Sequence, residues 1–372
     1  MKFAIITHVP HIKENSKLYA YAPYVREMNL WIENVDEVLL VAPIADLQPN
    51  AIHLPYEKEV RFMEIPGFNA IGLKAKISAL FKMPKLIAVI YKAMREADHI
   101  HLRCPGNVGL LGCFVQILFP KKPKTAKYAG NWDPESKQPF SYKFQRWILS
   151  NTFLTRNMQV LVYGNWPNQT KNIRPFFTAT YSEQDKKDVS LRTLDGKIKL
   201  LFAGTLAQGK RPLYAIQLAE SLINKGFDIQ LELFGDGPER DKLQEYIIKN
   251  NLQNPVLLKG NQTKESLQQA YEESHFLVLP SKSEGWPKVV AEAMFWGCVP
   301  VSSWVSCVPD MLDYGTRGVL LEMNLEQDSE NIAALLKAPE EYKNKAEKAM
   351  LWSRRYTLDY FESEIKSFLN NK

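Results

Sequence analysis

The feature that most constrains the fold is an alternation of short apolar runs with longer stretches that have helical spacing. In the first half of the chain the short runs are Phe3–Ile6, Val38–Val41, Val60–Ile65, His99–Leu102 and Val160–Tyr163. Helical patterns lie between them, as at Tyr21–Trp31 and Ala75–Arg95. Such alternation is typical of parallel sheets that carry helices on both faces.

A second series of the same kind follows in the other half. Its short runs are Lys199–Ala203, Ile229–Phe234, Val256–Leu258, Phe276–Leu279 and Val299–Ser302. Segments with helical spacing lie between them, at 211–224, 239–250, 264–273 and 287–296. Two such series in 372 residues predict an α/β protein with two doubly wound, Rossmann-like domains facing a cleft.

A polar stretch without apolar periodicity, from Tyr181 to Gly196, marks the border between the domains. We therefore expect an N-terminal domain over residues 1–183, a linker over 184–197 and a C-terminal domain over 198–351. The last segment, 352–372, has apolar residues at helical spacing. A helix there could pack back on either domain, the N-terminal one included.

Composition excludes several classes of protein. Hydrophobic residues make up 45% and charged residues 24% of the chain, as in soluble globular proteins. No apolar run reaches the ~18 residues that a membrane span requires. The cysteines Cys104, Cys113, Cys298 and Cys307 lack metal-binding spacing and are interpreted as buried thiols in a reducing compartment. We therefore expect a cytoplasmic protein.

The positive charge is concentrated in the first part of the chain. Residues 1–150 hold 20 Lys and Arg against 13 Asp and Glu, whereas the whole chain holds 47 against 41. The segment 71–95 places five lysines among apolar residues and is interpreted as one or two basic amphipathic helices. They could dock on the inner membrane leaflet, or they could be ordinary surface helices.

A strand, a polar loop and a helix at residues 276–296 carry the strongest signal for chemistry. Pro287 occupies the expected first helical position, which tolerates its missing N–H. The free N–H groups of a helix start, at the carboxyl end of a strand, suit a phosphate. The residues of this candidate site are Glu284, Gly285, Trp286, Pro287, Lys288 and Val289.

Two carboxylates belong to this segment. Glu284 would repel a phosphate, so it is expected to face hydroxyl groups. Glu292 lies in a helix made otherwise of apolar residues, where an ionised carboxylate is costly without donors. The hydroxyls of a ribose would supply them. Alternatively, Glu284 only caps the helix and Glu292 is solvated.

A second signal follows the first strand of the C-terminal domain. Gly204 and Thr205 begin a loop that ends with Lys210 and Arg211 at a helix start. Cations there oppose the positive end of the helix dipole, unless an anion is bound between them. A departing diphosphate would be such an anion. A weaker signal is the turn at Gly235, which could form a wall for a nucleotide or simply join a strand to a helix.

Three motifs resemble the retaining glycosyltransferases of family 4, which have the GT-B fold. They are Gly204 with Lys210, the turn Gly235-Asp236-Gly237-Pro238, and Glu284-Gly285 with Glu292. The similarity covers roughly residues 197–322. It implies that Glu292 holds the ribose and Glu284 the transferred sugar. It also implies that Lys210 and the backbone near Gly285 to Val289 hold the diphosphate. The family often has Arg directly after the first glycine, where this chain has Thr205, so Arg211 is the candidate substitute.

The first domain resembles family members that act in surface-polysaccharide assembly. The similarity lies in Leu102-Arg103-Cys104-Pro105-Gly106 and in Tyr128-Ala129-Gly130-Asn131-Trp132-Asp133-Pro134. By family position these segments face the acceptor. The candidates on the acceptor side are His8, His11, Arg103, Asn131 and Asp133, each with a structural role as the alternative.

The resemblance therefore predicts a glycosyltransferase that moves a sugar from a nucleotide-sugar, with UDP expected from family frequency, to a saccharide or lipid-linked acceptor. We expect no cofactor and no metal, since no DxD-like motif is evident. A glycine-rich dinucleotide fingerprint is absent after the first strand, which argues against NAD. Nucleic acid is not expected, because no aromatic platform accompanies the basic residues. The alternatives are a GT-B epimerase and a non-catalytic nucleotide-sugar-binding protein.

Overall fold

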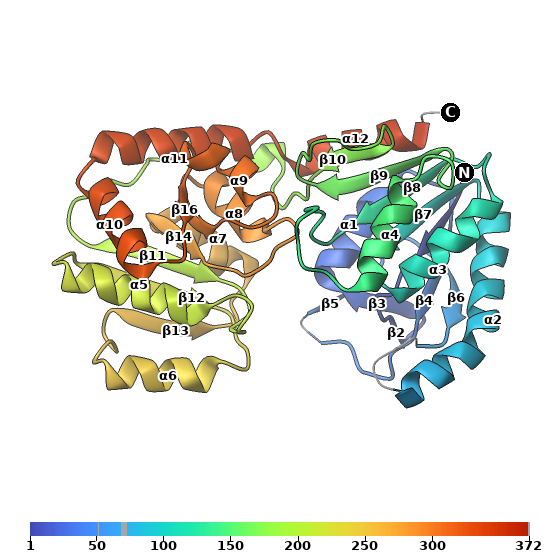
Figure 1. The fold of residues 1–372 in the computed structure, drawn as a ribbon, viewed down its shortest axis with the longest axis horizontal. Helices are drawn as coiled ribbons and strands as arrows, with labels where there is room; N and C mark the ends of the chain where they lie inside the picture. Colours follow the sequence, from blue (N-terminus) through green and yellow to red (C-terminus); the bar gives the residue numbers. More distant parts are fainter. Residues whose placement is uncertain (51, 68–72, 371–372) are drawn as a thin grey trace. The chain divides into compact units, whose positions relative to one another are not determined.

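The computed structural model describes residues 1–50, 52–67 and 73–370, and the side chains of these except 73–80. The chain divides into two compact units, each built around its own parallel sheet (Figure 1). Unit 1 runs from Met1 to Phe176 and includes the chain from Glu362 onward, and unit 2 is Phe177–Phe361.

The main sheet of unit 1 is parallel throughout, in the order β10-β9-β8-β7-β1-β4-β6. Its strands are β1 (Lys2–Ile6), β4 (Glu37–Pro43), β6 (Arg61–Ile65), β7 (His99–Cys104), β8 (Lys124–Tyr128), β9 (Met158–Tyr163) and β10 (Ile173–Phe176). A small antiparallel sheet consists of β2 (Ile12–Glu14), β3 (Lys17–Tyr21) and β5 (His53–Pro55).

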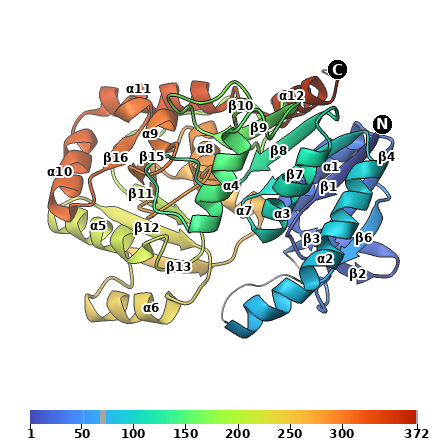
Figure 2. The same ribbon diagram turned by 45° about the vertical axis from the view of Figure 1, so that its right-hand side comes forward.

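Helices cover both faces of this sheet. Successive side chains of β1 point to opposite faces, so each face has apolar side chains to bury against helices. Phe3 stacks on Trp31 of α1 (Ala22–Glu33), with ring centroids 5.9 Å apart. Ala4 instead joins the core of the other face, with Leu86 and Cys113. That face carries α2 (Leu73–Glu96), α3 (Asn107–Val115) and α4 (Phe140–Ser150), which lie side by side in Figure 2; η1 (Gln116–Leu118) extends α3.

The sheet of unit 2 is also parallel, in the order β13-β12-β11-β14-β15-β16. Its strands are β11 (Ile198–Ala203), β12 (Ile229–Phe234), β13 (Val256–Gly260), β14 (Phe276–Leu279), β15 (Val299–Ser303) and β16 (Val319–Leu321). Its helices are α5 (Pro212–Asn224), α6 (Arg240–Lys249), α7 (Lys264–Glu273), α8 (Lys288–Phe295), α9 (Val308–Met311), α10 (Leu325–Leu336) and α11 (Pro339–Ser353). The last helix, α12 (Leu358–Asn370), begins in unit 2 and continues into unit 1.

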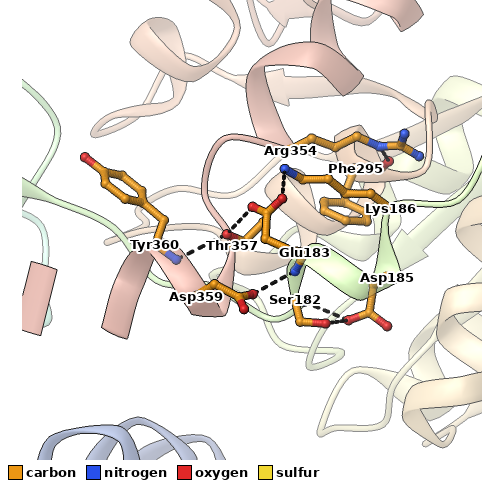
Figure 3. Close-up of polar contacts among 9 residues, drawn as sticks. All are labelled: Ser182, Glu183, Asp185, Lys186, Phe295, Arg354, Thr357, Asp359 and Tyr360. Atoms are coloured by element: carbon orange, nitrogen blue, oxygen red, sulfur yellow. Dashed lines mark hydrogen bonds and ion pairs between the residues drawn. The ribbon is translucent and has the colours of Figure 1, made fainter. Parts of the chain in front are cut away.

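The structure divides the chain at Phe176 rather than at residue 183, and the expected linker 184–197 is part of unit 2. Figure 3 shows the reason. Glu183 accepts a hydrogen bond from the hydroxyl of Thr357 and donates its backbone N–H to Asp359, at 2.8 and 2.7 Å. Arg192 further along donates to the carbonyl of Trp296. These contacts order a segment whose polar composition alone suggested a free linker.

Two parallel-sheet, Rossmann-like α/β units confirm the predicted fold class. Within the described ranges, no helix combines the length and the apolar character needed to cross a membrane.

Candidate active site

Two loops of unit 2 meet where neighbouring strands end. Strand β11 pairs with β14 in parallel, with Leu200 opposite Phe276, so the loops that follow them emerge at one edge of the sheet. The backbone N–H of Lys282 donates to the carbonyl of Gly209 over 2.8 Å and ties the two loops together. The two strongest sequence signals therefore lie next to each other at one edge of the sheet.

Lys210 and Glu284 form an ion pair across these loops. The Lys210 Nζ lies 2.5 Å from Glu284 Oε1, and the side chains are 33% and 8% exposed. The sequence assigned them to different groups of a ligand, the diphosphate and the sugar, and did not predict the pair. An ammonium group has three donors, so Lys210 can hold a phosphate oxygen while it remains paired.

Glu292 is half-buried on α8 and has protein partners for both carboxylate oxygens. Oε1 accepts from the hydroxyl of Thr180 at 2.7 Å, and Oε2 accepts from that of Tyr271 at 3.0 Å. Burial and the nearby Glu292 charge raise the pKa of Tyr271 well above its usual value, which keeps its hydroxyl a donor. The Glu292 carboxylate thus has hydroxyl donors, as its burial requires, but Thr180 and Tyr271 of the chain supply them.

The space beside Glu292 is small. A cavity of about 10 Å³, which Thr180, Lys288 and Tyr356 help to line, has room for about one water molecule. A ribose at Glu292 would require the Thr180 segment to move, a rearrangement that no sequence pattern indicates.

The start of α8 lies one residue later than predicted. Pro287 is the residue before the helix rather than its first residue, and no side chain caps it. Helical geometry leaves the first-turn N–H groups, such as that of Val289, without acceptors inside the helix. Nearby, Ser281 is fully buried and its hydroxyl has no hydrogen-bond partner among the described residues. Both are polar groups that a bound anion could satisfy.

Arg211, the second cation expected for the diphosphate, lies beside a different cavity. It precedes α5 in a left-handed conformation, with φ of 53°, and lines a separate cavity next to β16. Arg211 forms no ion pair within the part of the chain that the structure describes. Thr205, at the position where the resembled family often has Arg, is exposed.

Close packing accounts for the glycines in the turn after β12. A Cβ on Gly235, whose φ is +132°, would lie 2.0 Å from the carbonyl oxygen of Gly204, and one on Gly237 would lie 2.6 Å from that of Leu206. Two backbone hydrogen bonds, Gly204 N–H to Phe234 and Leu206 N–H to Asp236, fix the approach. The turn thus holds the loop of Lys210 in place.

We expect Gly235→Ala to lower the melting temperature of unit 2 by more than 10 °C, or to prevent soluble expression. The added methyl group would clash with backbone atoms that cannot move aside. Gly209→Ala is the matched control, since its Cβ would find nothing within 4 Å. Calorimetry of both variants checks this, and equal stability would contradict the packing role of Gly235.

Two of the acceptor-side candidates in unit 1 are buried. His11 is fully buried, and its ring nitrogens contact the carbonyl of Val9 and the hydroxyl of Tyr56, at 2.8 and 2.9 Å. Burial lowers the pKa of His11 to about 4, so the ring is neutral. Arg103 is buried and forms a two-pronged ion pair with Glu27. Both side chains thus have partners within the chain, as the structural alternative for these residues expects.

The other candidates lie at the carboxyl edge of the first sheet. His8 follows β1 and lies against Gly106, which follows β7; burial, and then the charge of Arg103, lower the pKa of His8. Asn131 and Asp133 follow β8, and their side chains accept the backbone N–H groups of Asp133 and Glu135. Since β1, β7 and β8 are neighbours, these three side chains share one edge of the sheet.

Comparison with known proteins adds to this geometry. Residues 183–352 match the family described as Glycosyl transferases group 1. Protein CapJ of Staphylococcus aureus is 21% identical over 82% of this chain and 78% of its own length. Alpha-D-kanosaminyltransferase of Streptomyces kanamyceticus is 29% identical over 44% of this chain and 43% of its own.

Among solved structures, Anabaena Alr3699/HepE in complex with UDP and glucose superposes with a TM-score of 0.68 at 14% identity, covering 100% of both chains. This likeness supports the GT-B fold for the two Rossmann-like units. Residues 183–352 of unit 2 therefore match a glycosyl transferases group 1 domain, which indicates a transferase enzyme.

Proposed function

We propose that this enzyme is a retaining glycosyltransferase that moves a sugar from a UDP-sugar to a saccharide or lipid-linked saccharide acceptor in surface-polysaccharide synthesis. The observation that carries the proposal is the pair of loops after β11 and β14, which bring a cation, a buried carboxylate and a helix start together. The family 4 resemblance supports the stereochemistry, and HepE, a protein of the same fold, binds UDP and glucose.

Lys210 is the proposed stabiliser of the leaving group. As the bond from the anomeric carbon to the phosphate oxygen breaks, its electron pair remains on the diphosphate. The Lys210 ammonium and the first N–H groups of α8 compensate this charge. The acceptor hydroxyl forms the new bond on the same face of the sugar and passes its proton to the departing phosphate.

Glu284 and Glu292 are proposed to hold hydroxyl groups of the donor. Only one Glu284 oxygen contacts Lys210, so the other can accept from the transferred sugar. At Glu292, ribose hydroxyls would replace those of Thr180 and Tyr271, exchanging one pair of donors for another. His8, Asn131 and Asp133 are proposed to contact the acceptor.

A screen of nucleotide-sugars tests the function. We expect a UDP-sugar to raise the melting temperature of the full chain most, and the same donor to release UDP when an acceptor saccharide is added. Turnover should persist in EDTA, because no metal is proposed. Release of UDP with conversion of the donor to an epimer, and with no new glycosidic bond, would favour the epimerase instead.

We also propose that unit 1 contacts an anionic membrane through α2 and α4. In the basic segment 71–95, residues 71 and 72 lie outside the described residues, as do the side chains of Lys74 and Lys76. From residue 81 onward α2 exposes apolar side chains, among them Phe81, which is 82% exposed. A shallow hollow on α2 is lined by Met83, Pro84, Ile87, Ala88 and Tyr91.

The apolar surface extends beyond the segment that the sequence indicated. On α4, Phe140, Phe144 and Trp147 stack in a row, with ring centroids 6.1 and 5.7 Å apart. Phe140 and Trp147 are 82% and 56% exposed. Arg95 lies over the ring of Tyr91, within 6.0 Å of its centroid. Aromatic rings beside cations are typical of surfaces that contact anionic lipid.

Replacing Phe81 and Trp147 together by Ser is expected to weaken binding to vesicles that contain phosphatidylglycerol by about tenfold or more, because two large apolar groups no longer enter the interface. Leu351→Ser is the control, since Leu351 of unit 2 is 68% exposed. Co-sedimentation measures the binding. Equal binding of all three proteins, or no preference for anionic over neutral vesicles, would contradict the proposal.

A further inference from the structure

A cavity of about 870 Å³ opens in unit 2 beside the edge strand β16. Neither Lys210 nor Glu284 lines it, although Arg211 and Lys282 from the same two loops do. Its volume lies in the range of small-molecule sites. Nothing in the proposed transfer reaction uses it.

The charge of the cavity favours an anion. Within the described ranges neither Arg211 nor Lys282 takes part in an ion pair, and both line the cavity. A third cation, Lys345, is paired with Glu341 at 3.3 Å. Glu322 is the remaining acidic residue of the lining and is exposed to solvent. The surplus of one cation suits a ligand with one acidic group.

The cavity also has an exposed aromatic wall. Trp304 and Tyr314 are 61% and 66% exposed, and their ring centroids lie 5.9 Å apart. Large exposed rings at a cavity offer flat apolar faces, and Asn331 and Glu322 in the same lining offer hydrogen-bonding groups. A sugar ring has the matching chemistry, since its C–H groups form an apolar face and its hydroxyls form a polar rim.

The backbone around the cavity is strained. Among the described residues, positive φ occurs at several Asn and one Asp, which tolerate it, and at Ser16 and Ser306. The other non-glycine residues with positive φ are Arg211, Tyr314 and Met323, with φ of 53°, 51° and 62°. All three line this cavity. Such conformations cost of order 1–3 kcal/mol each and occur preferentially where side chains hold ligands.

We propose that this cavity binds an acidic saccharide, with sugar rings on Trp304 and Tyr314 and a carboxylate or phosphate on Arg211 and Lys282. The proposal goes beyond the transfer reaction, because binding here requires neither donor nor turnover. Its failure would therefore leave the function of Lys210 and Glu284 untouched.

Calorimetry with the full chain tests this site, using a hyaluronan tetrasaccharide as the acidic probe and chitotetraose as the neutral one. We expect the acidic probe to bind about tenfold more tightly than the neutral one, and saturating UDP to leave its affinity unchanged. Trp304→Ala should weaken binding by about tenfold and Lys282→Ala by about fivefold. Trp304→Phe, which keeps a ring, should recover most of the loss and guards against a folding defect.

Lys249→Ala is the control, since Lys249 does not line the cavity, and this variant should bind as the unaltered chain does. Three results would overturn the proposal. They are no binding of the acidic probe at millimolar concentration, equal affinity of the Trp304→Ala variant, and competition by UDP, which would make the cavity part of the donor site.

Discussion

Lys210→Ala is expected to lower turnover with the preferred nucleotide-sugar by about 100- to 1,000-fold, while the affinity for the free nucleoside stays within about threefold. The difference arises because the charge on the diphosphate grows as the sugar departs, and the Lys210 ammonium is the cation at the strand ends that can meet it. A nucleoside has no phosphate, so its binding does not report on this contact. Steady-state kinetics and calorimetry on the same preparations give both numbers.

The ion pair complicates this variant. Glu284 is 8% exposed, and without Lys210 its carboxylate is buried without a counter-charge, which is destabilising. Low activity could then reflect a loosened loop rather than a missing cation. The double variant Lys210→Ala with Glu284→Gln separates these causes, because the neutral amide needs no counter-charge. We expect it to regain thermal stability and not turnover.

Lys199→Ala is the matched control, since Lys199 pairs with Glu273 at 2.8 Å on the surface of the same unit. With side chains 42% and 47% exposed, that pair contributes little to stability, and its loss should leave kinetics unchanged. Equal losses of turnover and nucleoside affinity in Lys210→Ala would argue against leaving-group stabilisation.

The fold could be predicted where strands are apolar and not where they are polar. The interior strands β1, β4, β11, β12 and β14 follow the expected runs to within one or two residues. Strand β8, Lys124–Tyr128, was missed because two of its residues are lysines. Both are buried: the Lys127 Nζ lies over the rings of Tyr163 and Phe176, and Lys124 donates to the carbonyl of Phe119. Such partners are distant in sequence, so no local pattern reveals them.

The candidate site could be located but not resolved. Adjacent parallel strands predict that the loops of Lys210 and Glu284 meet, and they do. Which side chains then pair depends on backbone angles within the loops, and the left-handed φ of Arg211 turns it toward another cavity. The burial of His11 and Arg103 likewise depends on Tyr56 and Glu27, which no motif connects to them.

Glu292→Ala is expected to weaken UDP binding by about 30- to 100-fold, because two hydrogen bonds between ribose hydroxyls and a carboxylate are lost. A donor analogue makes the contact specific. The unaltered enzyme should bind 2′,3′-dideoxy-UDP about as weakly as the variant binds UDP, and the variant should not distinguish the two ligands. Calorimetry on the four combinations measures the coupling directly.

The structure gives Glu292 a second role that this experiment must separate from the first. Because it holds the hydroxyls of Thr180 and Tyr271, its loss should also destabilise unit 2, whatever the ligand does. Thr180→Val removes one of those contacts and leaves the carboxylate in place. If ribose replaces Thr180 at Oε1, this variant loses about 1 kcal/mol of stability yet binds UDP as tightly or more tightly. If both variants lower stability and leave the affinity for UDP unchanged, Glu292 is a structural residue and the ribose binds elsewhere.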